Sequence, residues 1–191
     1  MKRKVVALTG SIGSGKSEVV RVLRSLGYLT VSCDELAKQV ATRPEVVDQV
    51  AALLGSEYVP DGQLDRKAIR DKVFTSEQLL SQYQAIFFDG VRQLLVDTLD
   101  KLNDEVVFVE IPVMDAFDFD WTEVWRVESN QSTQIKRVTH RDGVSEQSVL
   151  GTLARQKQYR HCSRVITNNG TVDELAEAVR SALIKSGIES K

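Results

Sequence analysis

Residues 10–17 have the side chains and spacing of a phosphate-binding loop. They read Gly-Ser-Ile-Gly-Ser-Gly-Lys-Ser, which matches the pattern GxxxxGK[ST]. Glycines let backbone N–H groups approach phosphate oxygens closely, and the N-terminus of a following helix adds partial positive charge. In this pattern Lys16 reaches the β- and γ-phosphates, and the Ser17 hydroxyl holds Mg²⁺. The loop therefore predicts binding of a nucleoside triphosphate together with Mg²⁺.

The segments on either side of the loop have the patterns that this motif requires. Residues 5–9 form a short apolar run that is typical of a buried parallel strand. Residues 18–26 have the apolar spacing of a helix, and Gly27 marks its end. A chance glycine-rich turn would not require strand, loop and helix in this order.

Length and composition favour one domain with a small insertion or lid. The chain has 191 residues, of which 42% are hydrophobic and 27% charged. A net charge of -2 argues against a nucleic-acid partner bound by bulk electrostatics. No apolar run is long enough to span a membrane, and the run after the basic start at residues 1–4 is short for a signal peptide.

The cysteines and histidines lack the spacing of a metal site. Cys33 and Cys162 are far apart in the sequence, as are His140 and His161. We expect reduced thiols and a cytoplasmic protein. We expect a monomer with small-molecule substrates, without a nucleic-acid or membrane partner.

Strand and helix patterns alternate along the chain, which predicts an α/β fold with a parallel sheet and helices on both faces. Strands are expected at residues 4–9, 28–32, 106–109, 123–128 and 164–168. Helices are expected at 34–41, 46–54, 66–102 with a break near 75–76, 133–141, 145–158, and after a capping box at Thr171. Residues 55–65 are expected to form a loop with a Pro-Asp-Gly turn, and Asp142–Gly143 a helix stop.

Further polar residues have positions that suit phosphoryl transfer, each with a plainer alternative. Asp34 follows the second strand at the carboxyl edge of the sheet, where it could act as a base or simply cap a helix. Arg137 and Arg141 are four residues apart on one helix face, which suits a phosphate-binding lid or a solvated basic surface. Glu110 follows an apolar strand and could orient water on Mg²⁺, or be a buried structural acid.

Several segments together resemble the dephospho-CoA kinase family. Residues 8–17 resemble its LTGGIGSGKS opening, 33–37 its D-A-D-x-x-A segment, 60–66 its D-G-x-L-D-R loop, 134–143 its Q-x-x-R-x-x-x-R-[DN]-G helix and 165–170 its V-I-x-N-x-G segment. Gln156 falls where the family has a glutamine that ends the next helix. The matches run through the whole chain in the order of the family.

The chain also departs from the family pattern at three places. Phe88–Asp89 stand where the family has His-Pro, residues 110–116 differ from its D-x-P-L-L-F-E strand end, and Ser163–Arg164 replace Ala-Asp. The phosphate loop, Asp34, Asp65–Arg66 and the lid arginines are retained.

The resemblance implies ATP-dependent phosphorylation of the ribose 3′-hydroxyl of dephospho-CoA, the last step of coenzyme A synthesis. It implies a P-loop kinase core with a five-stranded parallel sheet, formed by residues 1–55, 105–134 and 158–191. A helical acceptor-binding insertion is expected at about 60–105 and a lid at about 135–157.

The same resemblance implies roles for individual residues. Lys16, Asp34 and Arg141 are the expected catalytic residues. The expected ATP-binding residues are Ser11, Ile12, Gly13, Ser14, Gly15, Lys16, Ser17, Glu18, Arg137, Asn168 and Asn169. The expected acceptor-binding residues are Asp34, Leu64, Asp65, Arg66 and Phe88. Ser17 is the expected Mg²⁺ ligand, with Glu110 acting through water.

Two alternatives remain open at the level of the sequence. A nucleoside or nucleotide monophosphate kinase of the same architecture would share Lys16 and the lid, but would leave residues 61–66 unexplained. A degenerate nucleotide-binding paralogue is suggested by Phe88–Asp89, although it would need neither Asp34 nor Arg141.

Overall fold

The computed structural model describes residues 3–112, 119–156 and 159–188. The departure at residues 113–116 and the expected helix and lid ends at 157–158 lie outside the described residues. The chain divides into two compact units. Residues 1–32 with 104–191 form one, here called the sheet unit, and residues 33–103 form the other, the helical unit.

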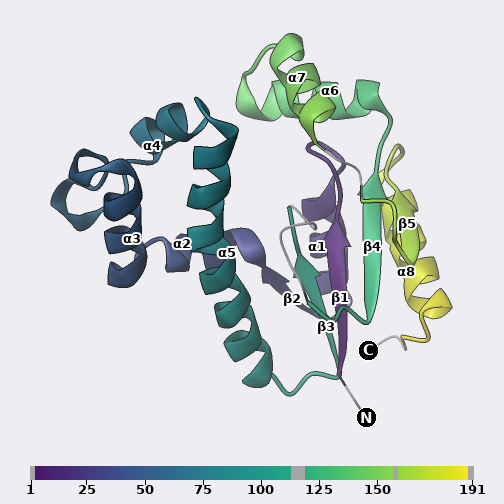
Figure 1. Cartoon of the computed structure of the whole chain (residues 1–191). Coiled ribbons are helices and arrows are strands. Elements are labelled where there is room, and N and C mark those ends of the chain that lie inside the picture. Colours follow the sequence, from purple (N-terminus) through teal and green to yellow (C-terminus); the bar gives the residue numbers. More distant parts are fainter. Residues whose placement is uncertain (1–2, 113–118, 157–158, 189–191) are drawn as a thin grey trace. The chain divides into compact units, whose positions relative to one another are not determined.

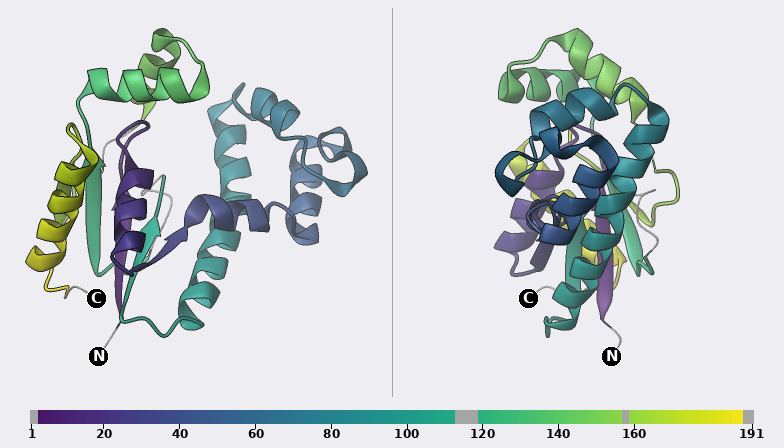
Figure 2. Two further views of the ribbon diagram at one scale, coloured as in Figure 1. Left: turned by 180° about the vertical axis from the view of Figure 1, so that it is seen from behind. Right: turned by 60° about the vertical axis from the view of Figure 1, so that its left-hand side comes forward.

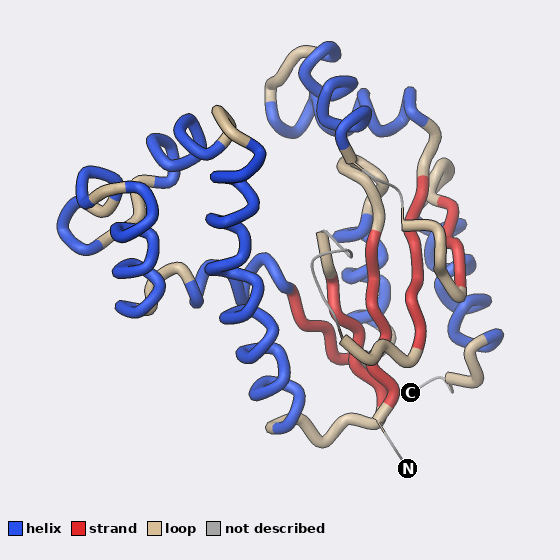
Figure 3. Tube along the Cα trace, viewed as in Figure 1, coloured by secondary structure: helices blue, strands red, loops and turns tan. Residues whose placement is uncertain are grey.

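The sheet unit contains five parallel strands, drawn red in Figure 3. They are β1 (Lys4–Thr9), β2 (Leu29–Ser32), β3 (Val106–Glu110), β4 (Glu123–Glu128) and β5 (Arg164–Thr167), in the order β2-β3-β1-β4-β5. Most residues of β1 and β3 are buried, as expected for apolar runs within a parallel sheet, and half of the residues of β4 are buried. The predicted α/β class and all five predicted strands are confirmed, with ends that differ by at most one residue.

Two helices cover one face of this sheet, as the left view of Figure 2 shows. They are α1 (Lys16–Ser25) and α8 (Val172–Lys185). Val6 and Leu8 of β1 share a buried cluster with residues of both helices, including Leu23 and Val179. The predicted capping box that begins α8 is present, since Thr171 and Glu174 bond each other's backbone N–H groups.

Two further helices of the sheet unit follow β4, where the sequence predicts a lid, and this pair is here called the lid helices. They are α6 (Gln131–Asp142) and α7 (Glu146–Arg155), which lie side by side beyond the carboxyl ends of β1 and β4 (Figure 1). The side chain of Asn130 caps α6 and that of Ser145 caps α7. Gly143 ends α6 with a φ of 66°, which confirms the predicted helix stop.

The helical unit consists of four α-helices with two short 3₁₀ helices between them. The α-helices are α2 (Cys33–Val40), α3 (Pro44–Leu54), α4 (Arg66–Val73) and α5 (Glu77–Asp100). The sequence correctly predicts the break between α4 and α5. The expected loop at 55–65 instead contains two 3₁₀ helices, Ser56–Tyr58 and Pro60–Gly62, because its turns close successive backbone hydrogen bonds. The unit begins at Cys33 because α2 and α3 both pack on α5.

Of the two alternatives for Asp34, base or helix cap, the cap is wrong. The helix begins at Cys33, so Asp34 lies inside its first turn. A carboxylate there still interacts favourably with the helix dipole, but it is not the cap residue.

Candidate nucleotide-binding site

The phosphate loop connects β1 to α1 and depends on glycine backbone conformations. Gly15 is the residue before α1 and has a φ of 94°, and Gly13 has a φ of 73°. Side chains other than hydrogen are disfavoured at these angles. The glycine positions of the motif are therefore required by the path of the backbone.

The loop presents backbone donors without protein acceptors. Within the described part of the chain, the N–H groups of Gly13, Gly15 and Ser17 donate to no protein acceptor. They cluster at the N-terminus of α1, where the helix dipole favours an anion. The loop is thus built to receive phosphate oxygens.

The side chains that begin α1 complete the loop. The Lys16 ammonium donates to the carbonyl of Gly10 at 2.7 Å, which holds its positive charge across the loop. Ser17 is exposed, and Glu18 forms a surface ion pair with Arg21. The ion pair gives Glu18 a local structural contact besides its expected place at the nucleotide.

The residues present fit Mg²⁺ that is held mainly by ATP and water. No group of three or more His, Cys, Asp or Glu side chains in the described ranges could form a protein cage for a metal. Mg²⁺ bound through substrate phosphates needs only one or two protein ligands. The exposed Ser17 hydroxyl can be one, and Glu110 lies at the carboxyl end of β3, opposite Leu8 and Ser32 in register.

Asn168, the residue after β5, is hydrogen-bonded to the phosphate loop. It is 3% exposed, and its amide nitrogen donates to the carbonyl of Ser14 at 3.1 Å. Its amide oxygen accepts a hydrogen bond from Arg137 at 3.1 Å, while Arg137 also donates to Ser129 Oγ at 3.0 Å. A buried amide with both ends bonded has a fixed orientation. Asn169 is exposed, and its side chain accepts from the N–H of Asn130.

The two lid arginines have different environments although both lie on α6. Arg137 contacts the loop network, whereas Arg141 is exposed and forms a two-pronged ion pair with Asp142 at 2.6 and 2.7 Å. The hydrogen bond from Arg141 lowers the pKa of Asp142, and the same bond raises the pKa of Arg141. In this conformation the structure brings Arg137 to the loop and leaves Arg141 on its neighbour.

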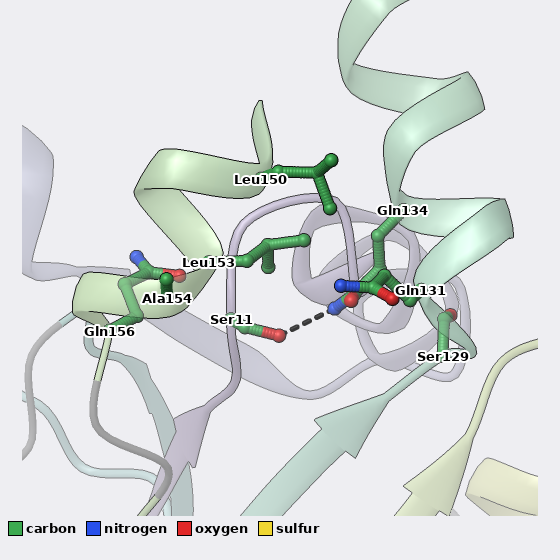
Figure 4. Close-up of a pocket in the computed structure, with 8 residues that line it drawn as sticks. All are labelled: Ser11, Ser129, Gln131, Gln134, Leu150, Leu153, Ala154 and Gln156. Atoms are coloured by element: carbon green, nitrogen blue, oxygen red, sulfur yellow. Dashed lines mark hydrogen bonds between the residues drawn. The ribbon is translucent and has the colours of Figure 1, made fainter. Parts of the chain in front are cut away.

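A cavity of about 500 Å³ lies between the lid helices and the loop (Figure 4). It is lined by Ser11, Ser129, Gln131, Gln134, Leu150, Leu153, Ala154 and Gln156. The Gln134 amide donates to Ser11 Oγ, and the N–H of Ile12 donates to the Gln156 amide oxygen at 2.8 Å. Two of the expected ATP-binding residues, Ser11 and Ile12, therefore also contact the lid.

Sequence reasoning gave no role to three residues of this network. Gln134 begins the lid segment that resembles the family pattern, and Gln156 has a family match, but their partners were not predicted. Ser129 was missed altogether. Its position directly after β4, before the cap residue Asn130, was the available signal, because polar groups gather at the carboxyl edge of parallel sheets.

The expected acceptor residues belong to the helical unit, and the contacts of Asp65 and Leu64 there are structural. Asp65 caps α4 by accepting from the N–H groups of Lys67 and Ala68, which fixes Arg66 as the exposed first residue of the helix. Leu64 packs against the core of the unit. Asp34 is exposed and Phe88 is partly buried on α5.

The fold and the loop together define a class of protein, the P-loop small-molecule kinases. A parallel sheet, a phosphate loop after β1 and a helical lid after β4 are the parts that phosphoryl transfer to a small acceptor requires. The dephospho-CoA kinase family model matches residues 4–174. The chain therefore belongs to the dephospho-CoA kinase family.

Individual relatives agree with this assignment. Dephospho-CoA kinase from Thermus thermophilus is 30% identical over 187 residues, which cover 94% of this chain and 90% of the relative. Dephospho-CoA kinase from Geobacter sulfurreducens is 31% identical over 196 residues, with 95% and 98% covered. The solved structure of TT1252 from Thermus thermophilus superposes with a TM-score of 0.84 at 29% identity, covering 97% of this chain and 98% of that one.

Proposed function

We propose that the protein transfers the γ-phosphoryl group of ATP to the ribose 3′-hydroxyl of dephospho-CoA, giving coenzyme A and ADP. The observation that carries the proposal is the loop with its unbonded N–H groups and Lys16, in a chain of the dephospho-CoA kinase family. In the reaction a bond forms between the acceptor O3′ and Pγ, and the bond between Pγ and the β–γ bridging oxygen breaks. The hydroxyl proton leaves with the base.

The loop residues are proposed to bind and neutralise the phosphates. Lys16 and the loop N–H groups contact the β- and γ-phosphates, with Mg²⁺ held by Ser17 and by water oriented by Glu110. Mg²⁺ supplies charge neutralisation when it is bound. Arg141 must exchange Asp142 for the transferring phosphoryl group, and this exchange is inexpensive because the ion pair is exposed.

The acceptor is proposed to bind through the helical unit. Asp34 takes the proton of the 3′-hydroxyl or orients it, and its exposed carboxylate has access to a substrate. Arg66 contributes a planar guanidinium for a phosphate of dephospho-CoA, and Leu64, Asp65 and Phe88 form or support the same site. Phe88 cannot make the hydrogen bonds of the histidine that the family has there.

We also propose that the enzyme is a cytoplasmic monomer. The two cysteines are thiols rather than a disulfide, which suits a reducing compartment. No helix of the described ranges is long and apolar enough to cross a membrane.

The test is direct formation of coenzyme A. Purified protein given ATP, Mg²⁺ and dephospho-CoA should yield coenzyme A, detected by mass. Lys16→Ala, purified identically, should form little and so exclude a contaminating kinase. Absence of coenzyme A, together with rapid phosphorylation of a nucleoside monophosphate, would contradict the proposal in favour of a nucleotide kinase. Nucleotide binding without any transfer would favour the degenerate paralogue.

A further inference from the structure

Two glutamines of the lid contact the first variable residues of the phosphate loop. Gln134 of α6 is buried and donates from its amide nitrogen to Ser11 Oγ. Gln156, which follows α7, accepts from the N–H of Ile12 at 2.8 Å. One hydrogen bond comes from α6 and the other from the residue after α7, and they reach adjacent loop residues; these two bonds are here called the ties.

The Ile12 N–H differs from its neighbours in the loop. The N–H groups of Gly13, Gly15 and Ser17 have no protein acceptor in the described ranges, whereas Ile12 donates to the lid. Phosphate oxygens can therefore occupy the remaining donors while the tie to Gln156 is intact. The tie is compatible with bound ATP and does not have to be displaced by it.

The ties fix the helix that carries the lid arginines. Gln134 lies one turn before Arg137 and two turns before Arg141 on α6. A shift of α6 away from the loop would break the Gln134–Ser11 bond and move both guanidinium groups with it. The cavity beneath the lid has only uncharged lining residues, so no charge there competes for the phosphates.

We propose that Gln134 and Gln156 are positioning residues that hold the lid on the phosphate loop during phosphoryl transfer. They act through Ser11, Ile12 and the arginines of α6. The activity readout rests on the proposed dephospho-CoA kinase function, while the exchange readout below does not. One net hydrogen bond corresponds to a change of roughly two- to tenfold in the closed population.

Gln156→Ala is the main test, because the side chain is exposed and its loss creates no buried cavity. We expect the kcat for coenzyme A formation to fall roughly two- to tenfold, with an unchanged midpoint of thermal unfolding and a KM for ATP within about twofold. Gln147→Ala is the matched control. Gln147 is an exposed glutamine of α7 without a side-chain hydrogen bond in the described ranges and outside the cavity lining, so both kinetic constants should stay at wild-type values.

Amide hydrogen exchange of Ile12, resolved by NMR, tests the tie without any turnover. We expect a protected amide in the wild type and in Gln147→Ala, and faster exchange in Gln156→Ala. Gln156→Glu retains an acceptor oxygen at the same chain length and should restore protection. For the second tie, Ser11→Ala and Gln134→Ala should each lower kcat, and the double variant should lower it no further than the larger single effect.

Three outcomes would overturn the proposal. Equal exchange at Ile12 in wild type and Gln156→Ala would mean that the tie does not form in solution. Tighter ATP binding by Gln156→Ala at wild-type kcat would mean that Gln156 competes with ATP. Fully additive effects of Ser11→Ala and Gln134→Ala on kcat would mean that the hydrogen bond between these two side chains does not contribute to turnover. If the wild type fails to convert dephospho-CoA while Ile12 is protected, the proposed function fails and the tie to the lid stands.

Discussion

Asn168 lies so close to Gly15 that no side chain fits at position 15. A Cβ added to Gly15 would lie 1.9 Å from the amide nitrogen of Asn168, which is held by its hydrogen bond to the Ser14 carbonyl. Gly15 also has a φ of 94°, where residues with a Cβ are strained. The end of β5 and the phosphate loop are therefore fitted to each other at this glycine.

Gly15→Ala should lower the free energy of unfolding more than Gly143→Ala does. Both glycines have positive φ, and this strain costs about 1–3 kcal/mol at each. Only Gly15→Ala adds a collision, because a Cβ at Gly143 would meet no atom within 4 Å. Denaturant unfolding of both variants measures the difference, and equal losses would contradict the close fit between Asn168 and the loop.

Asp65→Ala should destabilise α4 and weaken acceptor binding together. Loss of the cap costs about 0.5–2 kcal/mol and releases Arg66 at the first helical position. Asp65→Asn keeps a capping oxygen and should retain most of the stability. Ser76→Ala removes the cap of α5 and serves as the control, with a similar loss of stability but an unchanged KM for dephospho-CoA. A raised KM in both alanine variants would mean that general destabilisation, not Arg66, is responsible.

Asp34→Asn should lower kcat by about 10²–10⁴-fold, because general-base assistance has that magnitude. ATP affinity should stay near the wild-type value, measured by calorimetric titration. Glu35→Gln is the matched control, since Glu35 is the adjacent exposed acid of the same helix and pairs with Lys38 on the surface. Equal rates for Asp34→Asn and wild type would exclude Asp34 as the base.

The Asp142 carboxylate should stay charged to a lower pH than an ordinary aspartate, because Arg141 donates to it and lowers its pKa. The hydrogen bond from Arg141 lowers the pKa of Asp142 below its ordinary value of 3.8. Its contribution to stability is therefore present above about pH 3.8 and is lost as the pH falls through the lowered pKa. Carboxyl NMR titration should show the Asp142 pKa rising toward 3.8 in Arg141→Gln. An unchanged Asp142 pKa in that variant would mean that the pair does not persist in solution.

The pKa of Tyr83 should depend on the charge of Arg66. Burial raises the pKa of the Tyr83 phenol above 10.0, and the nearby Arg66 guanidinium partly opposes this shift. Arg66→Met should therefore raise the Tyr83 pKa further, as should a bound phosphate that neutralises Arg66. Phenolate absorbance, corrected with Tyr83→Phe, measures the shift. A lower Tyr83 pKa in Arg66→Met would contradict the predicted influence of Arg66.

The sequence by itself determined the phosphate loop, the five strands and the stop of α6. These features are local, because loop spacing, apolar runs and capping residues act over a few neighbouring residues. The position of Gly15 and the helix stop at Gly143 followed from such rules. The alternative in which Asp34 caps α2 is wrong, because a one-residue shift of a helix start is not encoded in any local pattern.

Only the tertiary structure decided which side chains complete the site. The hydrogen bonds of Gln134 to Ser11, Ile12 to Gln156 and Asn168 to Ser14 join residues separated by 123, 144 and 154 positions. The spacing of Arg137 and Arg141 predicted a shared helix but not that Asp142 would bind one of them. Parallel strands end at one edge of the sheet, so distant segments meet there. Their hydrogen-bond partners are set by packing geometry and not by sequence spacing.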